Sequence, residues 1–220
     1  MYTDEMVKQL PAIVKIHPHY AEWLIRKRSS KKLLQYIRKR YSAANILEIG
    51  CGNGWLSAQM AEATTGNVTG LDLNHVEIAQ AKRVFANINN CRFIAGNVDP
   101  DVLGDGKFDL IIFAASIQYF KSLKDTLRLS LKHLTLQGEI HIIDSMLYEY
   151  MKIPAAQERS KKYFSSMGFP EMAHHYFHHC ITSLGSFERE ILHDPRAWWN
   201  KFTYPANPFY WVVIKKRYYR

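Results

Sequence analysis

The chain has 220 residues, of which 47% are hydrophobic and 22% are charged, and its formal net charge at pH 7 is +9. This balance is typical of a globular protein with one well-buried core, and it excludes a disordered or fibrous chain. No apolar run reaches the roughly 18 to 20 residues of a membrane span, and we expect no secretory signal in the opening MYTDEMVKQL. Three scattered cysteines, Cys51, Cys91 and Cys180, do not form a disulfide framework. We therefore expect a cytoplasmic protein.

The positive charge is concentrated at the two ends of the chain. Residues 1–41 hold ten Lys/Arg against three acids, and residues 211–220 hold four Lys/Arg and no acid. Residues 42–210 therefore carry a net charge of −2. A basic groove over this middle segment is not indicated, although the N-terminal segment leaves RNA open as a partner.

The pattern of the N-terminal segment predicts two short helices, over residues 19–27 and 30–41. Ser30 is a candidate cap for the second helix, and Leu33 and Ile37 lie on its apolar face. We expect this region to fold over the functional site.

Strands and helices alternate from residue 45 onward. The strands are short and apolar, which is typical of a parallel sheet covered by helices on both faces. We expect a Rossmann-like, doubly wound α/β sheet of seven strands, mostly parallel with an antiparallel last strand. The predicted strands cover residues 45–50, 67–73, 91–96, 108–113, 138–144, 187–193 and 209–216. The predicted helices of this part cover residues 55–64, 75–89 and 121–136, and residues 146–186 are expected to be mainly helical.

The stretch LEIGCGNGWLS places three glycines, Gly50, Gly52 and Gly54, at the first strand-to-helix turn. Without Cβ atoms, the backbone there bends sharply and lies against a ligand; a purely structural turn accounts less well for three such positions. A dinucleotide fingerprint would have its third glycine where Trp55 stands, and Glu48 suits a cationic ligand better than a pyrophosphate. No GK[ST] follows, which excludes a P-loop.

LEIGCGNG resembles the first motif of class I S-adenosylmethionine-dependent methyltransferases. GLDLN, FIAGN, FDLIIFAAS and LKHLTLQGEIHIIDS, in this order, resemble their later motifs, and together the similarity covers about residues 45–145. The resemblance implies S-adenosyl-L-methionine as cofactor, S-adenosyl-L-homocysteine as product, and a one-step methyl transfer that depends mainly on alignment and exclusion of water. The compact chain favours a small-molecule acceptor.

The same resemblance implies roles for individual residues. Asp72 matches the acid that grips the ribose hydroxyls, and Asn97 stands where the family commonly has an Asp that recognises the adenine amino group. Glu48 either favours the cationic end of the cofactor or braces the loop. The complete implied cofactor set is Glu48, Gly50, Cys51, Gly52, Gly54, Asp72, Leu73, Asn97, Val98 and Ala114.

Substrate contacts are expected after the fourth strand. Ser116, Gln118 and Tyr119 either bind a polar substrate or cap the following helix. Because residues 146–186 fall between the fifth and sixth strands, we expect them to form a substrate lid. His175 and Tyr176 are its weak candidates for a general base, which this reaction does not require.

The histidines of AHHYFHHC lie four apart, which would place each pair on one helix face and suits a metal. The pairs are His174 with His178 and His175 with His179. No third ligand is nearby, so we expect a solvated or lid-lining face and no metal site.

We expect a single methyltransferase domain over residues 1–220. It comprises basic N-terminal helices (1–41), a cofactor-binding core (45–145), the lid (146–186) and the last strands (187–220). Two alternatives stay open: an RNA methyltransferase that uses the basic N-terminal segment, and a catalytically silent cofactor-binding scaffold. Neither the acceptor atom nor the oligomeric state is indicated by the sequence.

Overall fold

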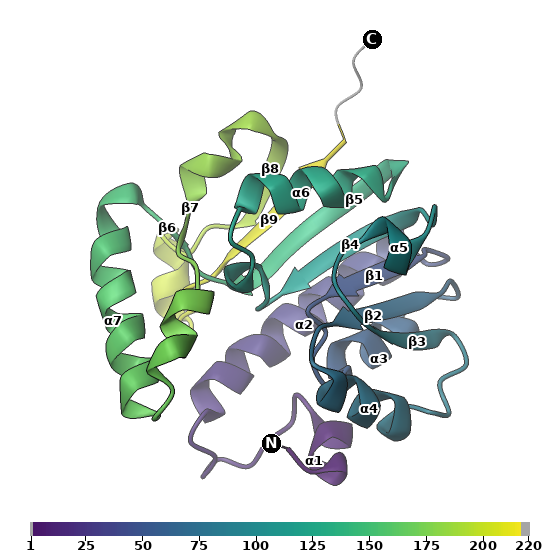
Figure 1. Cartoon of the computed structure of the whole chain (residues 1–220), viewed down its shortest axis with the longest axis horizontal. Coiled ribbons are helices and arrows are strands. Elements are labelled where there is room, and N and C mark those ends of the chain that lie inside the picture. The colour runs from purple at the N-terminus through teal and green to yellow at the C-terminus, as the bar shows by residue number, and fades with distance from the viewer. Residues whose placement is uncertain (1, 217–220) are drawn as a thin grey trace.

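The computed structural model describes residues 2–216 and contains a seven-stranded sheet of order β3-β2-β1-β4-β5-β9-β8 (Figure 1). Only β9 runs antiparallel, to both β5 and β8. The predicted sheet is therefore confirmed, including its antiparallel last strand. Its strands are β1 (Ile46–Ile49), β2 (Val68–Asp72), β3 (Cys91–Ala95), β4 (Phe108–Ala114), β5 (Leu134–Ser145), β8 (Glu188–His193) and β9 (Tyr210–Lys215). Residues 217–220 of the predicted last segment, and Met1, lie outside the described residues.

The sheet has an apolar core on each face because successive strand residues point in opposite directions. In β1, Leu47 packs with α6 (Leu123–Lys132) on one face, whereas Ile46 packs with α2 (Tyr20–Arg40) and α3 (Trp55–Ala61) on the other. In Figure 1, α6 lies in front of the sheet and α2 lies behind it. The remaining helices of this part are α1 (Asp4–Gln9), α4 (His75–Val84) and α5 (Pro100–Leu103).

The N-terminal region forms one long helix, α2, where the sequence predicted two. The serine expected to start the second helix is an interior residue: Ser30 donates to the carbonyl oxygen of Lys27, and its neighbour Ser29 donates to that of Ile25. A serine hydroxyl bonded to the preceding turn remains within a helix. Both side chains are buried, so the helix continues through them. Other predicted boundaries also shift: α4 ends at Val84, and β5 begins at Leu134 through pairing with Phe108.

Residues 146–186 are less helical than predicted. Their α-helix is α7 (Ile153–Ser166), which is packed against the 3₁₀ turn η3 (Pro170–His175) outside the sheet (Figure 1). The two-residue strands β6 (Leu147–Tyr148) and β7 (His179–Cys180) pair with each other. Short 3₁₀ segments complete the chain: η1 (Ile117–Tyr119), η2 (Tyr150–Lys152), η4 (Ile181–Ser186) and η5 (Trp198–Phe202).

The expected histidine faces of this segment are wrong, because the segment is not a continuous helix. His174 and His175 end η3, whereas His179 lies in β7 and contacts the carbonyl oxygen of Ile117. Within residues 2–216, no three His, Cys, Asp or Glu side chains come together to hold a metal ion. Over the same residues, every helix is too short or too polar to cross a membrane.

Candidate active site

The glycine turn connects β1 to α3 at the edge of the sheet where the strand order reverses, and this edge is where open α/β sheets bind ligands. Gly50 has φ +76°, and a Cβ there would overlap the side chain of Ser116. Gly54 has φ +78°, and a Cβ there would overlap the ring of Phe93. Both positions therefore require glycine, for conformation and for space.

Asp72 ties the glycine turn to the end of β2. One carboxylate oxygen accepts from the backbone N–H of Gly52 at 2.8 Å, and the other accepts from that of Asn74 at 2.8 Å. Each carboxylate oxygen has a second acceptor direction, so both remain able to receive a hydroxyl group. Asp72 is thereby held in a fixed orientation towards the cavity in front of the turn.

Glu48 is a carboxylate within the buried strand β1, where only 2% of it is exposed. It accepts a hydrogen bond from the Ser57 hydroxyl of α3. Burial raises the pKa of Glu48 to about 8, and the nearby charge of Asp72 acts in the same direction. Burial, with the charge of Asp72, also raises the pKa of Glu77 on α4. Three carboxyl groups thus gather around the turn, and a cationic ligand bound beside them would favour their charged forms and lower the raised pKa values of Glu48 and Glu77.

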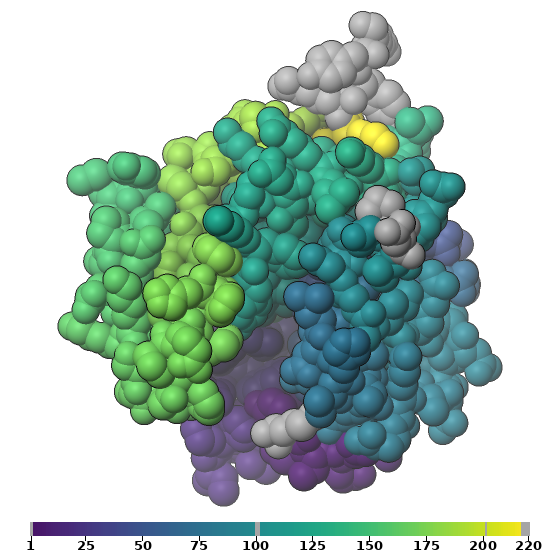
Figure 2. Space-filling model, in the orientation of Figure 1, coloured from purple at the N-terminus to yellow at the C-terminus, as the bar shows by residue number. Residues whose placement is uncertain are grey.

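Two hollows meet at the turn. The first, of about 420 Å³, lies between the turn, α2 and α7, and the second, of about 580 Å³, lies beyond Asp72. Figure 2 shows the surface hollowed where the N-terminal segment, the core and the green segment that includes η3 meet. Gly50, Asp72, Glu77, Ser116 and Tyr119 line both hollows. An elongated ligand can therefore lie across the turn.

The predicted cofactor residues fall into these two hollows, with one exception. Glu48, Cys51, Gly52 and Ala114 line the first, and Leu73, Asn97 and Val98 line the second, while Gly54 lines neither and packs behind the turn.

Not all of the candidate substrate residues line the hollows. Ser116 is held by a hydrogen bond to the Ile49 carbonyl oxygen at 2.6 Å. Gln118 lines neither hollow, because it turns back to donate to the Ala115 carbonyl oxygen at 2.7 Å. His175 borders the second hollow, and Tyr176 borders neither.

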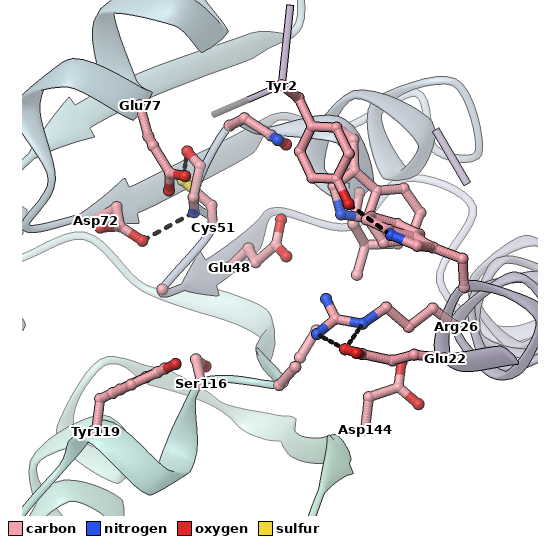
Figure 3. Close-up of a pocket in the computed structure, with 18 of the residues that line it drawn as sticks. Tyr2, Glu22, Arg26, Glu48, Cys51, Asp72, Glu77, Ser116, Tyr119 and Asp144 are labelled. Carbon is pink, nitrogen blue, oxygen red and sulfur yellow. Dashed lines mark hydrogen bonds and ion pairs between the residues drawn. The ribbon is translucent and has the colours of Figure 1, made fainter. Parts of the chain in front are cut away.

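The sequence did not single out Asp144 as a site residue. Figure 3 shows Asp72, Glu77 and Cys51 at one end of the first hollow, and Glu22, Arg26 and Asp144 at the other. Arg26 donates twice to Glu22, at 2.7 and 3.0 Å. Both residues lie in α2, within the part of it that the sequence predicted as a helix over residues 19–27.

The roof of the first hollow is formed by the N-terminal segment. Trp23 donates its indole N–H to the Tyr2 hydroxyl at 2.8 Å, and the Arg26 guanidinium lies 5.3 Å from the centre of the Trp23 ring. Tyr163 of α7 borders the hollow from the opposite segment. The hollow is therefore enclosed by residues far apart in the sequence.

This strand order, with a glycine turn and an acid at the end of β2, defines a class I methyltransferase fold. The family model described as "Methyltransferase domain" matches residues 41–207, so the chain belongs to this methyltransferase family. The family prediction is thus confirmed.

Individual relatives differ in what they act on. The malonyl-[acyl-carrier protein] O-methyltransferase of Bacillus cereus is 27% identical over 145 residues, which are 63% of this chain and 52% of that protein. Ribosomal RNA small subunit methyltransferase C of Erwinia tasmaniensis is 31% identical over 129 residues, 56% of this chain and 37% of that protein. The chain spans about half the length, or less, of these curated relatives.

Among solved structures, the plantazolicin methyltransferase BpumL, in complex with a triazolic desmethylPZN analog and SAH, has the same fold. Its TM-score is 0.62 at 15% identity, and the match covers 97% of this chain and 90% of that one.

Proposed function

We propose that the protein transfers a methyl group from S-adenosylmethionine to a small-molecule acceptor. The observation that carries this proposal is the pair of hollows that meet at Gly50 and Asp72. A molecule with a nucleoside at one end and a charged amino-acid part at the other fits across such a turn. When bound, the cofactor supplies a methyl group on a sulfonium, whose sulfur is a good leaving group.

The residues divide between the two ends of this cofactor. Asp72 would receive the ribose hydroxyls, with Leu73, Asn97 and Val98 around the base in the second hollow. Glu48 and the backbone of the glycine turn would contact the cationic amino-acid part. BpumL, which has the same fold, is crystallised with SAH, and this supports the assignment.

The walls of the first hollow favour a small acceptor over RNA. Of the basic residues in α2, Arg26 lines the hollow, and both of its hydrogen bonds go to Glu22. The exposed Lys27, Arg28 and Lys31 do not line it. A phosphate inside this hollow would meet the carboxylates of Glu22 and Asp144, while Arg26 is already bonded to Glu22.

The first test is calorimetric binding of S-adenosylhomocysteine to the wild type and to Asp72→Ala, with NADH as the control ligand. Loss of the carboxylate removes two hydrogen-bond acceptors for the ribose, so we expect affinity to fall by roughly 10- to 100-fold. Asp105→Ala, on an exposed loop, is the matched control and should bind as the wild type does. Folded wild type that binds no S-adenosylhomocysteine would contradict the proposal.

A further inference from the structure

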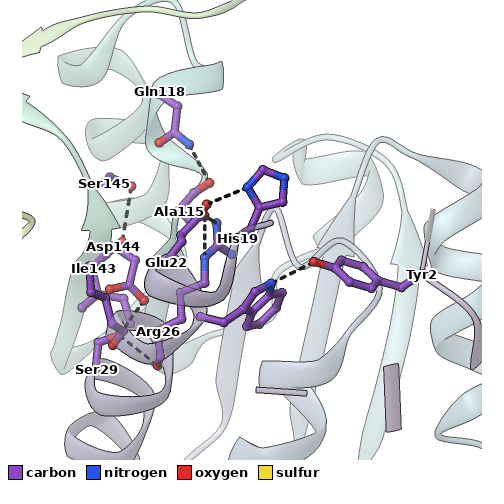
Figure 4. A network of polar contacts seen from close by, with 12 residues as sticks. Tyr2, His19, Glu22, Arg26, Ser29, Ala115, Gln118, Ile143, Asp144 and Ser145 are labelled. Carbon is purple, nitrogen blue, oxygen red and sulfur yellow. Dashed lines mark hydrogen bonds and ion pairs between the residues drawn. The ribbon is translucent and has the colours of Figure 1, made fainter. Parts of the chain in front are cut away.

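Asp144 lies at the end of β5 and separates two cavities. It borders the first hollow and also a smaller cavity of about 120 Å³ behind it. Its Oδ2 accepts from the Ser29 hydroxyl at 2.6 Å, whereas its Oδ1 has no partner in the protein (Figure 4). The side chain is nonetheless buried, with 8% of the residue exposed. One oxygen is thus fixed and the other is left without a donor.

The backbone at this position is also unusual, because Asp144 has φ +53°. Residues with a Cβ adopt this conformation uncommonly, although Asp and Asn do so more often than most, and such positions cluster at functional sites. A buried carboxylate oxygen without a donor is a second unfavourable feature at the same residue. Both features oppose folding and both are consistent with a carboxylate that receives its donor from a ligand.

The groups that face Asp144 restrict what this ligand can be. From α2, Glu22, Arg26 and Ser29 approach it. The Arg26 guanidinium donates to Glu22 and not to Asp144. An acceptor that carries a carboxylate would therefore meet two acids here, whereas one that carries an N–H would supply the absent donor. The aromatic rings of Trp23, Tyr119 and Tyr163 line the same hollow.

We propose that Asp144 receives the N–H of the methyl acceptor, and that the acceptor is an amine on a small aromatic molecule. This inference rests on the proposed methyl transfer. An alkylamine reaches the site as its ammonium ion, which has no lone pair, so it first gives one proton to Asp144, and from there the proton passes to water. The amine nitrogen then uses its lone pair to form the new N–CH₃ bond as the S–CH₃ bond breaks, and the electron pair of the broken bond remains on sulfur. The positive charge moves from sulfur to nitrogen, close to the Asp144 carboxylate, which stabilises it. The product leaves as the methylated ammonium ion, and Asp144 remains a carboxylate.

The test measures binding to the protein loaded with S-adenosylhomocysteine, so it does not depend on turnover. The probes are phenethylamine and 3-phenylpropionate, which are similar in size and differ in the terminal group. Asp144→Asn keeps an acceptor for Ser29 and removes the charge, and asparagine tolerates a positive φ well. Asp105→Asn is the control variant.

We expect the wild type to bind phenethylamine at least roughly tenfold more tightly than 3-phenylpropionate, and Asp144→Asn to lose roughly tenfold or more of the amine affinity. S-Adenosylhomocysteine should bind both proteins equally, which also shows that the variant is folded. Unchanged amine affinity in Asp144→Asn, no amine binding, or a preference for the acid would overturn the inference while leaving the proposed function intact. Failure of the wild type to bind S-adenosylhomocysteine would instead contradict the proposed function itself.

Discussion

Replacing Glu48 by glutamine should stabilise the protein, and increasingly so as the pH rises. The pKa of Glu48 is raised from 4.5 to about 8 by burial, so the folded state holds its proton where the unfolded state has released it. Stability then falls as the pH rises from about 4.5 to about 8, because the folded state must either bind a proton or carry a buried charge. Glutamine removes this titration and can still accept from Ser57.

The size of this change in stability follows from the shift in the pKa of Glu48. Each pKa unit corresponds to about 1.4 kcal/mol, so the difference in unfolding free energy between Glu48→Gln and the wild type should grow by about 3 kcal/mol between pH 5 and pH 8. Urea unfolding of both proteins at several pH values measures this difference, and titrations common to both cancel. Glu62→Gln, at the exposed end of α3, controls for the substitution itself. A difference that is constant with pH, or one in which the wild type gains relative stability as the pH rises, would refute the reasoning.

Two further substitutions test the glycine turn and the contact of α2 with the middle of β5. Gly54→Ala should lose more stability than Gly104→Ala in thermal unfolding, because both glycines have positive φ but only a Cβ at position 54 meets Phe93 and Ala81. We expect a loss of unfolding free energy of about 1 kcal/mol at position 104 and of at least about 3 kcal/mol at position 54. Equal losses would show that crowding at position 54 is unimportant. Tyr36→Phe removes a 2.6 Å hydrogen bond to the Glu139 carboxylate. Burial raises the pKa of Glu139, but hydrogen bonds from His141 and Tyr36 outweigh the effect of burial and hold this pKa at about 2. The stability that the Glu139 carboxylate contributes is present above pH 4.5 and is lost as the pH falls towards 2. Tyr36→Phe should therefore lose about 1 kcal/mol of unfolding free energy in urea at pH 7 and less near pH 2. An equal loss at the two pH values would show that the hydrogen bond does not depend on the charge of Glu139.

The strands of the core were predictable because each is a short apolar run bounded by polar or glycine residues. Leu47 and Ile46 point to different cores, and both need apolar side chains whatever covers them. The glycine turn and Asp72 were predictable because a close approach of the backbone restricts the residue type locally. These features depend on residues that are close together in the sequence, so the local sequence pattern is enough to predict them.

The remaining features depend on contacts between distant segments. Ser29 and Ser30 have the composition of a helix start, but both are buried and donate to carbonyl oxygens of the preceding turn, so the helix continues through them. Pairing of β6 with β7 joins Leu147 to His179, and no local pattern marks either as a strand. Asp144 ends an apolar strand like any boundary acid, and its partner Ser29 lies 115 positions earlier.

The residues that line the first hollow come from both sides of a boundary in the chain. The match to the family begins at residue 41, after α2 has ended, so Glu22, Trp23 and Arg26 lie before it. Asp144 lies within the matched residues and faces the same end of the hollow as Glu22 and Arg26. The family model therefore covers the glycine turn but not the helix α2 that borders the other end of the hollow. Under the proposed function, substitutions on α2 would change which molecule is methylated while the glycine turn and Asp72 stay the same.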